Sequence, residues 1–587
     1  MEYRGYDSAG VAVSSGEDIK CIKSKGRVAL LKQECGKEVV KGTLGVGHTR
    51  WATHGEPSEK NAHPHTDCDH DFFVVHNGVI ENYQVLKDRL IEAGHTFVSQ
   101  TDTEVIAHLI EEYYEGDFKE AFRSALNDMR GALGIAVVSK RHPGELLAAR
   151  FGSPLILGFG KDEYVIASDV TAILPTTNSV VYMNDRDLIA FKDGRYEISD
   201  FKNGIVSGKR QATTIKWDHK DAELGGYTHF MLKEIFEQPE ALENTMRGRL
   251  VPSEGTVKFG GLEAIENRLR AINKLTITGM GTARLSGVIS EYAFEELARI
   301  PTKVEYGSEF TYRSAAVDEN TGLIAISQSG ETADTINAVK EAHRKGMLTL
   351  GVVNVIGSSL SREVDAGIYN HVGPEIAVAS TKASTSQVLL LAMLAVYLGR
   401  MRGLSKSEGQ EIIKAMQRLP SQVKQCLNNA PSIEAMARKY KNSNSFLFLG
   451  RKYNTGAAIE GALKLKECAN VHAEGINSTE LKHGPLSLID ANLPSLVIAP
   501  NDSMYEKNKT CIQEIKARSG TVIVITTEGN EEIRTISDDV IYIPSTLEML
   551  FPILAFIPMQ LFAYYMAIER GNDVDKPRNL AKSVTVE

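Results

Sequence analysis

Residues 323–335 constrain the fold of this chain more than any other segment. The apolar run 323–326 is typical of a buried parallel strand, and it ends at Ser327, Gln328, Ser329 and Gly330, just before a helical pattern that begins near Thr332. A strand, a tight loop and a helix N-terminus bring hydroxyl groups, backbone N–H groups and a helix dipole to one point. The pattern predicts a phosphate-binding loop, although an ordinary helix cap has the same appearance in sequence.

Two further turns of this kind occur nearby. Residues 278–282 follow an apolar strand at 275–277 and end at Thr282, and residues 379–382 open a helix that runs through residue 389. Three hydroxyl-bearing turns at strand ends or helix openings are typical of a sugar-phosphate pocket in an open α/β sheet.

The second part of the chain repeats itself at an offset of roughly 170 residues. The strand and helix at 275–300 recur at 446–468, and the strands at 323–326 and 348–355 recur at 496–499 and 521–526. The repeat predicts two duplicated, doubly wound, flavodoxin-like α/β domains at 261–405 and 430–572. Residues 200–260 are expected to form a linker with interdomain helices, and residues 573–587 an extended C-terminal tail.

Bulk composition narrows the functional classes. The chain has 587 residues, enough for about three domains, and a net charge of −9 without long runs of one sign. Such a balance argues against nucleic-acid and membrane-surface partners. Six cysteines without paired spacing favour a reducing, cytoplasmic compartment. The run 549–568, interrupted by Pro552, Pro558 and Gln560, is the one membrane-like segment, and we predict a buried core helix there.

Residues 1–199 differ from the rest because short β-rich runs dominate them. Only two helices are expected, at 82–93 and 103–113. The pattern predicts a layered, mostly antiparallel α+β domain. The expected strands are 9–13, 44–48, 72–76, 134–138, 146–149, 155–158, 164–167 and 180–183.

The residues of this domain that could carry chemistry lie where strands end. Arg50 can bind a carboxylate with its guanidinium, and Asp102 can hold an ammonium group. The Asn77 amide and the Gly78 N–H can form an oxyanion hole, so together these groups would bind a free amino acid and polarise a third carbonyl. Two structural alternatives stay open: Asn77-Gly78 is also a hairpin-turn sequence, and residues 101–104 are also a capping box.

A cluster of metal-binding residue types lies between these motifs. His63, His65, Cys68 and His70 fit either a solvated loop or a metal cluster. No second ligand pair lies at a zinc-site spacing, so we predict no metal.

Four motifs carry a resemblance to a known family: E-Y-R-G-Y-D-S-A-G at 2–10, H-T-R-W-A-T-H-G at 48–55, H-N-G at 76–78 and T-D-T-E at 101–104. They resemble the glutaminase domain of the N-terminal-nucleophile amidotransferases, and the whole chain resembles the glutamine:fructose-6-phosphate amidotransferase family with its two sugar isomerase (SIS) domains. The resemblance implies an oxyanion hole at Asn77 and Gly78, and an ammonia-gating loop at Trp51. The glutamine-binding residues that it implies are Arg50, Trp51, Thr53, His54, Asn77, Gly78 and Asp102.

One departure from that family concerns its nucleophile. In the family this is a cysteine at the start of the mature chain, in a strand followed by a helix, whereas this sequence starts at Met1-Glu2-Tyr3. We therefore expect no nucleophilic cysteine in this chain, because Cys21, Cys35 and Cys68 are not N-terminal. A start placed too late is favoured over a loss of glutaminase activity, because the glutamine-binding residues are all retained.

The second repeat has a charged stripe of its own. Glu460, Lys464 and Glu467 are spaced four and three residues apart, so they share one helical face. Ion pairs on an exposed helix are one interpretation. The helix is also apolar at neighbouring positions, which favours a stripe that lines a cleft, where a carboxylate can move a proton between adjacent carbons as in an aldose–ketose isomerase.

The resemblance assigns roles to this half. Glu467 is implied as the C1/C2 proton carrier with Lys464 and Glu460 beside it, His483 as a ring-opening group from a second subunit of a homodimer, and Lys582 as the amine that forms a Schiff base in a catalytic tail. Ala283, in place of a serine, and residues 475–479 depart from the family pattern. The implied sugar-phosphate site consists of Thr282, Ser327, Gln328, Ser329, Thr332, Val378, Ser380 and Ala581.

The resemblance implies transfer of the glutamine amide nitrogen to fructose 6-phosphate, followed by isomerisation to glucosamine 6-phosphate, the entry step of amino-sugar synthesis. The expected partners are these two substrates, and no cofactor is expected. One alternative is an ammonia-dependent sugar-phosphate isomerase or deglycase without glutaminase activity. Another is a non-catalytic sugar-phosphate sensor, against which the presence of Glu467, His483 and Lys582 argues.

Overall fold

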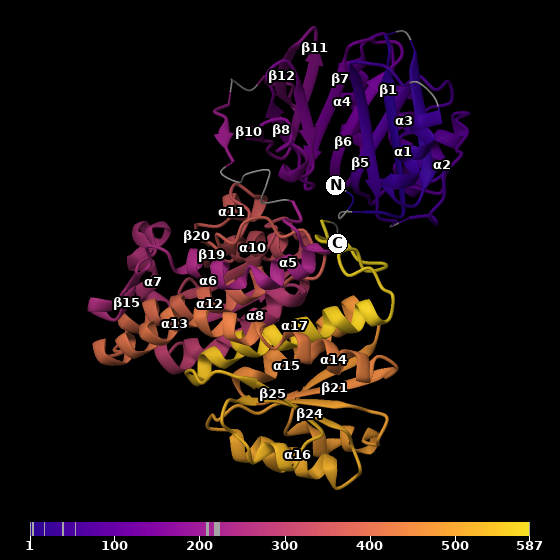
Figure 1. Ribbon diagram of the computed structural model, residues 1–587. Coiled ribbons are helices and arrows are strands. Elements are labelled where there is room, and N and C mark those ends of the chain that lie inside the picture. The colour runs from indigo at the N-terminus through magenta and orange to yellow at the C-terminus, as the bar shows by residue number, and fades with distance from the viewer. Residues whose placement is uncertain are drawn as a thin grey trace. The chain divides into compact units, whose positions relative to one another are not determined.

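The computed structural model describes residues 2, 5–16, 18–37, 40–52, 54–206, 210–215 and 223–585. The chain divides into two compact units (Figure 1). The first unit comprises Met1–His219 together with Ser583–Glu587, and the second comprises Lys220–Lys582. Residues 207–209 and 216–222 of the expected linker lie outside the described residues.

The first unit is built from antiparallel sheets. A six-stranded sheet has the order β12-β11-β7-β6-β5-β4, a four-stranded sheet β13-β10-β8-β9 and a three-stranded sheet β2-β1-β3. The strands are β1 (Ser8–Ser14), β2 (Ile19–Lys25), β3 (Leu44–Arg50), β4 (His65–Thr66), β5 (Phe72–Ile80), β6 (Gly131–Ser139), β7 (Leu146–Phe151), β8 (Ile156–Phe159), β9 (Tyr164–Ala167), β10 (Ser179–Tyr182), β11 (Asp187–Lys192), β12 (Arg195–Asp200) and β13 (Thr213–Thr214).

Four helices accompany these strands: α1 (Val28–Lys37), α2 (Tyr83–Glu92), α3 (Glu104–Glu112) and α4 (Phe118–Asp128). The apolar faces of α3 and α4 join the β5, β6 and β7 side chains in one hydrophobic cluster. The expectation of only two helices is therefore wrong. The sequence does signal α4, because the Asp117 side chain accepts a hydrogen bond from the Glu120 N–H and apolar residues recur at helical spacing. By contrast, Leu31 is the one buried residue of α1, so the sequence of α1 lacks a clear apolar face that would predict a helix.

The second unit contains two parallel five-stranded sheets with the orders β17-β16-β18-β19-β20 and β22-β21-β23-β24-β25. Both orders are 2-1-3-4-5 within their repeat, which confirms the duplicated flavodoxin-like fold expected from the sequence. The strands are β16 (Lys274–Gly279), β17 (Thr302–Tyr306), β18 (Thr321–Ser327), β19 (Leu348–Val353), β20 (Ala366–Tyr369), β21 (Ser445–Gly450), β22 (His472–Asn477), β23 (Ser495–Ile498), β24 (Val522–Thr527) and β25 (Asp539–Ile543), with a short pair β14 (Leu250–Val251) and β15 (Thr256–Val257).

Helices join the two parallel sheets into one core. Contacts link α8 to α12 and α15, and α15 to α17, and a single hydrophobic cluster includes residues of both sheets (Figure 1). The helices are α5 (Phe230–Phe236), α6 (Gln238–Met246), α7 (Glu266–Ala271), α8 (Gly281–Ala298), α9 (Gly307–Tyr312), α10 (Ala333–Arg344), α11 (Ser359–Glu363), α12 (Lys382–Arg400), α13 (Lys406–Leu427), α14 (Ala430–Tyr440), α15 (Tyr453–Ala469), α16 (Tyr505–Lys516) and α17 (Phe551–Glu569).

Two helices of the second unit are long and apolar enough to cross a membrane. The apolar window of α12 is 94% buried inside the protein, and that of the segment Glu548–Glu569 is 89% buried. The membrane-like run at 549–568 therefore forms a buried helix, whereas the expectation that it is the only such run is wrong. Helix α17 carries one buried amide side chain, Gln560, and that side chain has a hydrogen-bond partner inside the protein. The Gln560 Oε1 accepts a hydrogen bond from Gln238 Nε2 at 2.8 Å.

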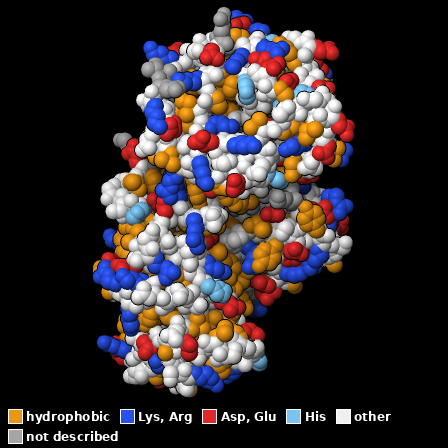
Figure 2. Space-filling model, turned by 90° about the vertical axis from the view of Figure 1, so that its right-hand side faces the viewer, with side chains coloured by type: hydrophobic (Ala, Val, Ile, Leu, Met, Phe, Trp, Pro, Cys, Tyr) orange, Lys and Arg blue, Asp and Glu red, His pale blue; other side chains and the backbone are white. Residues whose placement is uncertain are grey.

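Charged side chains of both signs are mixed over the surface. On the face shown in Figure 2, Lys and Arg side chains alternate with Asp and Glu side chains, without a continuous patch of one sign. This distribution agrees with the modest net charge of −9.

Close packing between β22 and α15 generates a prediction. A Cβ atom at Gly475 would lie 2.4 Å from the Ile459 Cα and 2.7 Å from the Ala458 carbonyl oxygen, both backbone atoms that cannot rotate away. We expect Gly475→Ala to lower the free energy of unfolding by about 1–3 kcal/mol, because the strand must move away from the helix. Chemical denaturation monitored by circular dichroism measures this change.

The matched control is Gly260→Ala, because a Cβ there meets no atom within 4 Å. That variant should stay within about 0.5 kcal/mol of the parent. Equal stability of the two variants would contradict the packing argument.

Candidate functional site

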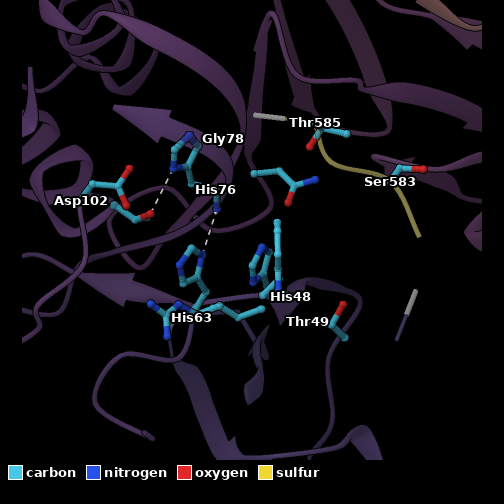
Figure 3. A pocket seen from close by; sticks show the side chains of 12 residues that line it. His48, Thr49, His63, His76, Gly78, Asp102, Ser583 and Thr585 are labelled. Carbon is cyan, nitrogen blue, oxygen red and sulfur yellow. Dashed lines mark hydrogen bonds between the residues drawn. The ribbon is translucent and has the colours of Figure 1, made fainter. Parts of the chain in front are cut away.

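The first unit contains a cavity of about 60 Å³ at the ends of β3 and β5 and the start of α3. Figure 3 shows His63, His76 and Asp102 on one side of it and Ser583 and Thr585 on the other. Its lining includes five of the seven residues that the resemblance assigned to glutamine: Arg50, Trp51, Asn77, Gly78 and Asp102. His54 lies beside it, with Nδ1 4.0 Å from Asp102 Oδ1, and Thr53 lies outside the described residues.

Arg50 ends β3 and is almost fully buried, with 4% of its surface exposed. Its Nη2 donates to the carbonyl oxygens of His54 and Gly55, the latter at 3.1 Å. Its Nη1 is buried and has no hydrogen-bond partner among the residues that the structure describes. A buried guanidinium nitrogen with donors to spare is suited to a carboxylate ligand.

Asp102 precedes α3 and is equally buried. Its Oδ2 accepts the Ile80 N–H at 2.8 Å, which fixes the carboxylate relative to β5. The turn that carries Asp102 is held by Glu104, whose carboxylate oxygens accept the N–H groups of Val98 and Ser99 at 2.6 Å each. Thr103 is the N-cap residue and its side chain makes no capping bond, so the capping-box interpretation of 101–104 is wrong.

Asn77 and Gly78 lie within β5, opposite Gly134 and Leu133 of β6. The strand therefore does not end at His76, and the hairpin-turn alternative is wrong. Gly78 has φ +141°, and a Cβ there would lie 1.8 Å from the Ala132 carbonyl oxygen. Only glycine fits this irregular point of the strand, where the backbone reaches the cavity.

Three histidines of the cavity are neutral. Burial, followed by the charge of His76, lowers the pKa of His48 to about 3, and burial also lowers the pKa values of His63 and His76. The His48 and His63 rings stack with centroids 4.1 Å apart. Arg50 and Asp102 are therefore the charged groups that line the cavity among the described residues.

The possible metal cluster of His63, His65, Cys68 and His70 does not form. His63 lines the cavity, His65 Nε2 lies 3.0 Å from Thr101 Oγ1, and His70 Nδ1 lies 2.7 Å from Thr66 Oγ1. Cys68 instead faces His95 and His108.

In the second unit, the loop after β18 has the predicted shape. Gly330 has φ +66°, and its N–H donates to Ser327 Oγ at 3.0 Å. Ser327 Oγ lies 3.2 Å from Thr332 Oγ1, and Ser329 Oγ accepts the Glu331 N–H at 3.1 Å. Thr332 is the N-cap of α10, but its side chain makes no capping bond. The hydroxyl groups therefore gather around a helix N-terminus without serving as an ordinary cap, which favours a phosphate site.

The charged stripe on α15 lies in the interior. Glu460 and Lys464 have 1% of their side chains exposed and Glu467 has 22%, which excludes the interpretation as ion pairs on an exposed helix. Lys464 Nζ lies 3.3 Å from Glu460 Oε1 and 2.5 Å from Glu467 Oε2. Thr282 of α8 joins the group, because Lys464 Nζ donates to its Oγ1 at 3.1 Å and that hydroxyl donates to Glu460 Oε1 at 3.0 Å.

Burial controls the protonation of this group. It raises the pKa of Glu460 to about 7, although Lys464 acts in the opposite direction. Burial opposes the charge on Lys464, but Glu460 and Glu467 together raise its pKa above the usual lysine value. The lysine is thus charged, and Glu460 is partly protonated near neutral pH.

Lys582 lies in a second buried cluster. Its Nζ donates to Glu375 Oε2 at 2.5 Å and to the Ala377 carbonyl at 2.8 Å. Glu375 also accepts the Ser380 hydroxyl at 3.1 Å. The tail is anchored because the Val378 N–H donates to the Asp575 carbonyl at 3.0 Å. Val378, Ser380 and Lys582, which sequence reasoning assigned to one site, are therefore brought together, and Ala581 precedes the lysine.

Sequence reasoning missed Glu375 and Glu234 in this cluster. Burial, followed by the charge of Glu375, raises the pKa of Glu234 to about 8, and Glu234 Oε1 accepts the Ile376 N–H at 2.5 Å. A lone acidic residue directly before the apolar run 376–379 was the available signal for Glu375.

His483 ends a short 3-10 helix, Glu480–His483, and is exposed. Among the described residues it makes no hydrogen bond or ion pair with the α15 stripe or with Lys582. The structure of one chain therefore does not bring His483 together with the other predicted catalytic residues.

Comparison with known proteins gives matches along the whole chain. The family described as SIS domain matches residues 268–397 and 439–570, and the Glutamine amidotransferase domain matches 35–212. The glutamine--fructose-6-phosphate aminotransferase [isomerizing] of Thermus thermophilus is 48% identical over 588 residues, 100% of this chain and 96% of that protein. The protein of the same name from Chlorobaculum tepidum is 45% identical over 594 residues, with the same coverage.

A solved structure supports the assignment of the second unit. The C-terminal domain of glucosamine-fructose-6-phosphate aminotransferase from Francisella tularensis is 34% identical, with a TM-score of 0.58, and the match covers 60% of this chain and 99% of that one. The similarity extends over the full length, and the chain has both the two parallel-sheet domains and the antiparallel amidotransferase unit. This chain therefore belongs to the family of isomerizing glutamine--fructose-6-phosphate aminotransferases.

Proposed function

We propose that this chain transfers the amide nitrogen of glutamine to fructose 6-phosphate and isomerises the product to glucosamine 6-phosphate, with release of glutamate. The observation that carries the proposal is the buried Lys464, which contacts Glu460 and Glu467 of the second repeat and Thr282 of the first. The names of the full-length relatives and the Glutamine amidotransferase match support it.

The first unit supplies the nitrogen. Arg50 binds the α-carboxylate of glutamine through its unused Nη1, and Asp102 binds the α-ammonium group. When a nucleophile adds to the side-chain carbonyl of glutamine, the Asn77 amide and the Gly78 N–H stabilise the resulting oxyanion, and ammonia leaves as this tetrahedral intermediate collapses. Trp51, Thr53 and His54 complete the binding loop. This set favours glutamine-dependent transfer over an ammonia-dependent isomerase or deglycase.

The second unit binds the sugar phosphate. The hydroxyl groups and N–H groups of residues 327–332 hold the phosphate at the start of α10, and Thr282, Val378, Ser380 and Ala581 lie around the sugar. The Lys582 amine attacks the C2 carbonyl of the open-chain ketose, and water leaves as the imine forms. Glu375 keeps this lysine in position through the 2.5 Å contact.

Glu467 moves the proton between C1 and C2 of the sugar. It is the member of the α15 stripe that reaches solvent, with 22% of its side chain exposed, so a ligand can approach it. Lys464 fixes its carboxylate and Glu460 balances the charge of the lysine. A base held in one orientation is what general base catalysis requires.

The exposure of His483 and the charge distribution of the surface support proposals about the oligomer and about other partners. We propose a homodimer in which His483 of each chain opens the sugar ring in the other chain, because this exposed histidine makes no described contact with the site of its own chain. Mixed surface charges and the buried α12 and α17 support a cytoplasmic enzyme without nucleic-acid or membrane partners.

The imine proposal predicts the behaviour of Lys582→Ala. Borohydride treatment in the presence of fructose 6-phosphate should trap the sugar on the parent chain and not on the variant, because the amine is missing. Phosphate binding by the variant should persist, since it depends on residues 327–332. Lys576→Ala, a tail lysine outside the Glu375 cluster, serves as the control and should trap normally. Persistent trapping on Lys582→Ala would remove this lysine from the mechanism.

The proton-transfer proposal predicts the behaviour of Glu467→Gln. Exchange of the C1 hydrogen of the sugar phosphate in deuterated water should fall by roughly 10² to 10⁴, because the amide keeps the shape but cannot act as a base. Thermal melting should change little. The control is Glu506→Gln, a surface carboxylate with 78% of its side chain exposed. Near-normal exchange in Glu467→Gln would contradict its role.

The pKa of Glu460 predicts a pH dependence. Its folded-state pKa of about 7 exceeds the ordinary 4.5, so its contribution to stability is complete below about pH 4.5 and is lost as pH rises through about 7. Glu460→Gln stays neutral, so its free energy of unfolding should improve relative to the parent, by up to about 3 kcal/mol, between about pH 5 and about pH 8. Denaturation curves across this range measure it, and a constant difference would contradict the raised pKa.

A further inference from the structure

The first unit contains a group of metal-binding side chains outside the glutamine cavity. Cys68, His95, His108 and Glu111 each offer one ligand atom, and all four atoms lie within 4.8 Å of one another. Cys68 lies in the loop between β4 and β5, His95 follows α2, and the other two residues lie one turn apart on α3. None of the four residues lines the glutamine cavity.

The distances within this group are close to those of a tetrahedral site. Cys68 Sγ lies 3.8 Å from His95 Nδ1 and 3.6 Å from His108 Nδ1. Glu111 Oε2 lies 2.8 Å from His95 Nδ1 and 3.2 Å from His108 Nδ1. Zinc bonds of about 2.3 Å to sulfur and about 2.0–2.1 Å to nitrogen or oxygen give tetrahedral edges of about 3.3–3.6 Å. Each of these four distances therefore changes by about half an ångström or less when zinc enters.

The outer nitrogen of each imidazole faces a carboxylate. His95 Nε2 lies 3.0 Å from Glu112 Oε2, and His108 Nε2 lies 3.7 Å from Glu104 Oε1. The Glu112 carboxylate holds the proton on Nε2 of His95 and leaves its Nδ1 lone pair for a metal, whereas His108 Nε2 has no hydrogen-bond partner among the described residues. The Thr96 N–H donates to Cys68 Sγ at 3.4 Å, which fixes the position of the sulfur.

The electrostatics of the group call for a cation. If Nε2 carries the proton on both rings, two Nδ1 lone pairs, the Cys68 sulfur and the Glu111 carboxylate all face one another. In that state the Cys68 S–H is the one donor that the four groups hold, and it can satisfy only one Nδ1, so the other lone pairs stay opposed to one another. A divalent cation satisfies the four groups at once, and it balances one thiolate and one carboxylate in charge.

We propose that Cys68, His95, His108 and Glu111 form a four-coordinate zinc site. One thiolate, two imidazoles and one carboxylate are a ligand set typical of zinc, and four protein ligands leave no open position for a substrate. The metal ties the loop before β5 and the segment after α2 to α3, the helix that follows Asp102. Its role is therefore to hold the glutamine-binding end of α3 in place.

This site was not visible in sequence. In sequence, Cys68 groups with His63, His65 and His70, and the prediction was no metal because no second ligand pair lies at a zinc-site spacing. Two ligands are a His and a Glu three residues apart on a helix, a spacing that surface ion pairs also use. Only the fold brings Cys68 and His95 to them.

The test uses the full chain, stripped of metal with a chelator and then titrated with zinc against a chromophoric competitor. One equivalent should bind, and cobalt in its place should show a thiolate charge-transfer band and the d–d bands of a tetrahedral site. Cys68→Ser should lose the charge-transfer band and weaken zinc binding by about 100-fold or more, whereas Cys21→Ser, another exposed cysteine, should change neither.

A second variant keeps the test decisive if Cys68→Ser does not fold. Glu112 lies on the surface and touches only the outer nitrogen of His95, so Glu112→Gln should weaken zinc binding by about 10–100-fold without removing a ligand. Absence of stoichiometric binding, cobalt spectra without a thiolate band, or unchanged affinity in Glu112→Gln would each overturn the proposal.

Discussion

The interaction on which the second unit depends is the burial of the Lys464 ammonium group between two carboxylates. A buried charge is costly unless it is paired, and here its partners come from both repeats, because Thr282 belongs to the first sheet domain and the glutamates to the second. Such a group contributes little net stability compared with an apolar core. It does favour one relative position of the two repeats, because only there do Thr282 of α8 and the α15 stripe satisfy one another.

The same principle positions the tail. An extended segment has few contacts of its own, so its location depends on a small number of strong ones. Asp575 accepts the N–H groups of Phe230 and Met231 at 2.9 and 2.8 Å, and Lys582 reaches Glu375 in the interior. The two ends of a short segment are thus fixed by charged groups that would be unsatisfied without it. The Lys582 amine, on an otherwise irregular segment, is held in this way as firmly as a core residue.

Sequence reasoning identified the parts of the structure whose signal is local. Three features could be recognised from short stretches of sequence, and the fold contains all of them. They are the apolar strand 323–326 with its hydroxyl loop, the repeat of the sheet domains, and the 460–467 stripe. Contacts between segments that are distant in sequence could not be predicted from the sequence. Glu375 with Lys582, and Cys68 with His95, are separated by long stretches whose geometry only the fold defines. Asn77-Gly78 was ambiguous for another reason, since the same dipeptide serves a turn and an irregular strand.

Helix α17 has a consequence for how the chain acquires its structure. It packs on α5, α14 and α15, and it is the last helix in the chain, at Phe551–Glu569. During synthesis, the apolar faces of those earlier helices leave the ribosome before α17 does, so they stay uncovered until α17 has emerged as well. The core of the second unit therefore closes only once α17 has joined them, and until then its exposed apolar surface favours aggregation.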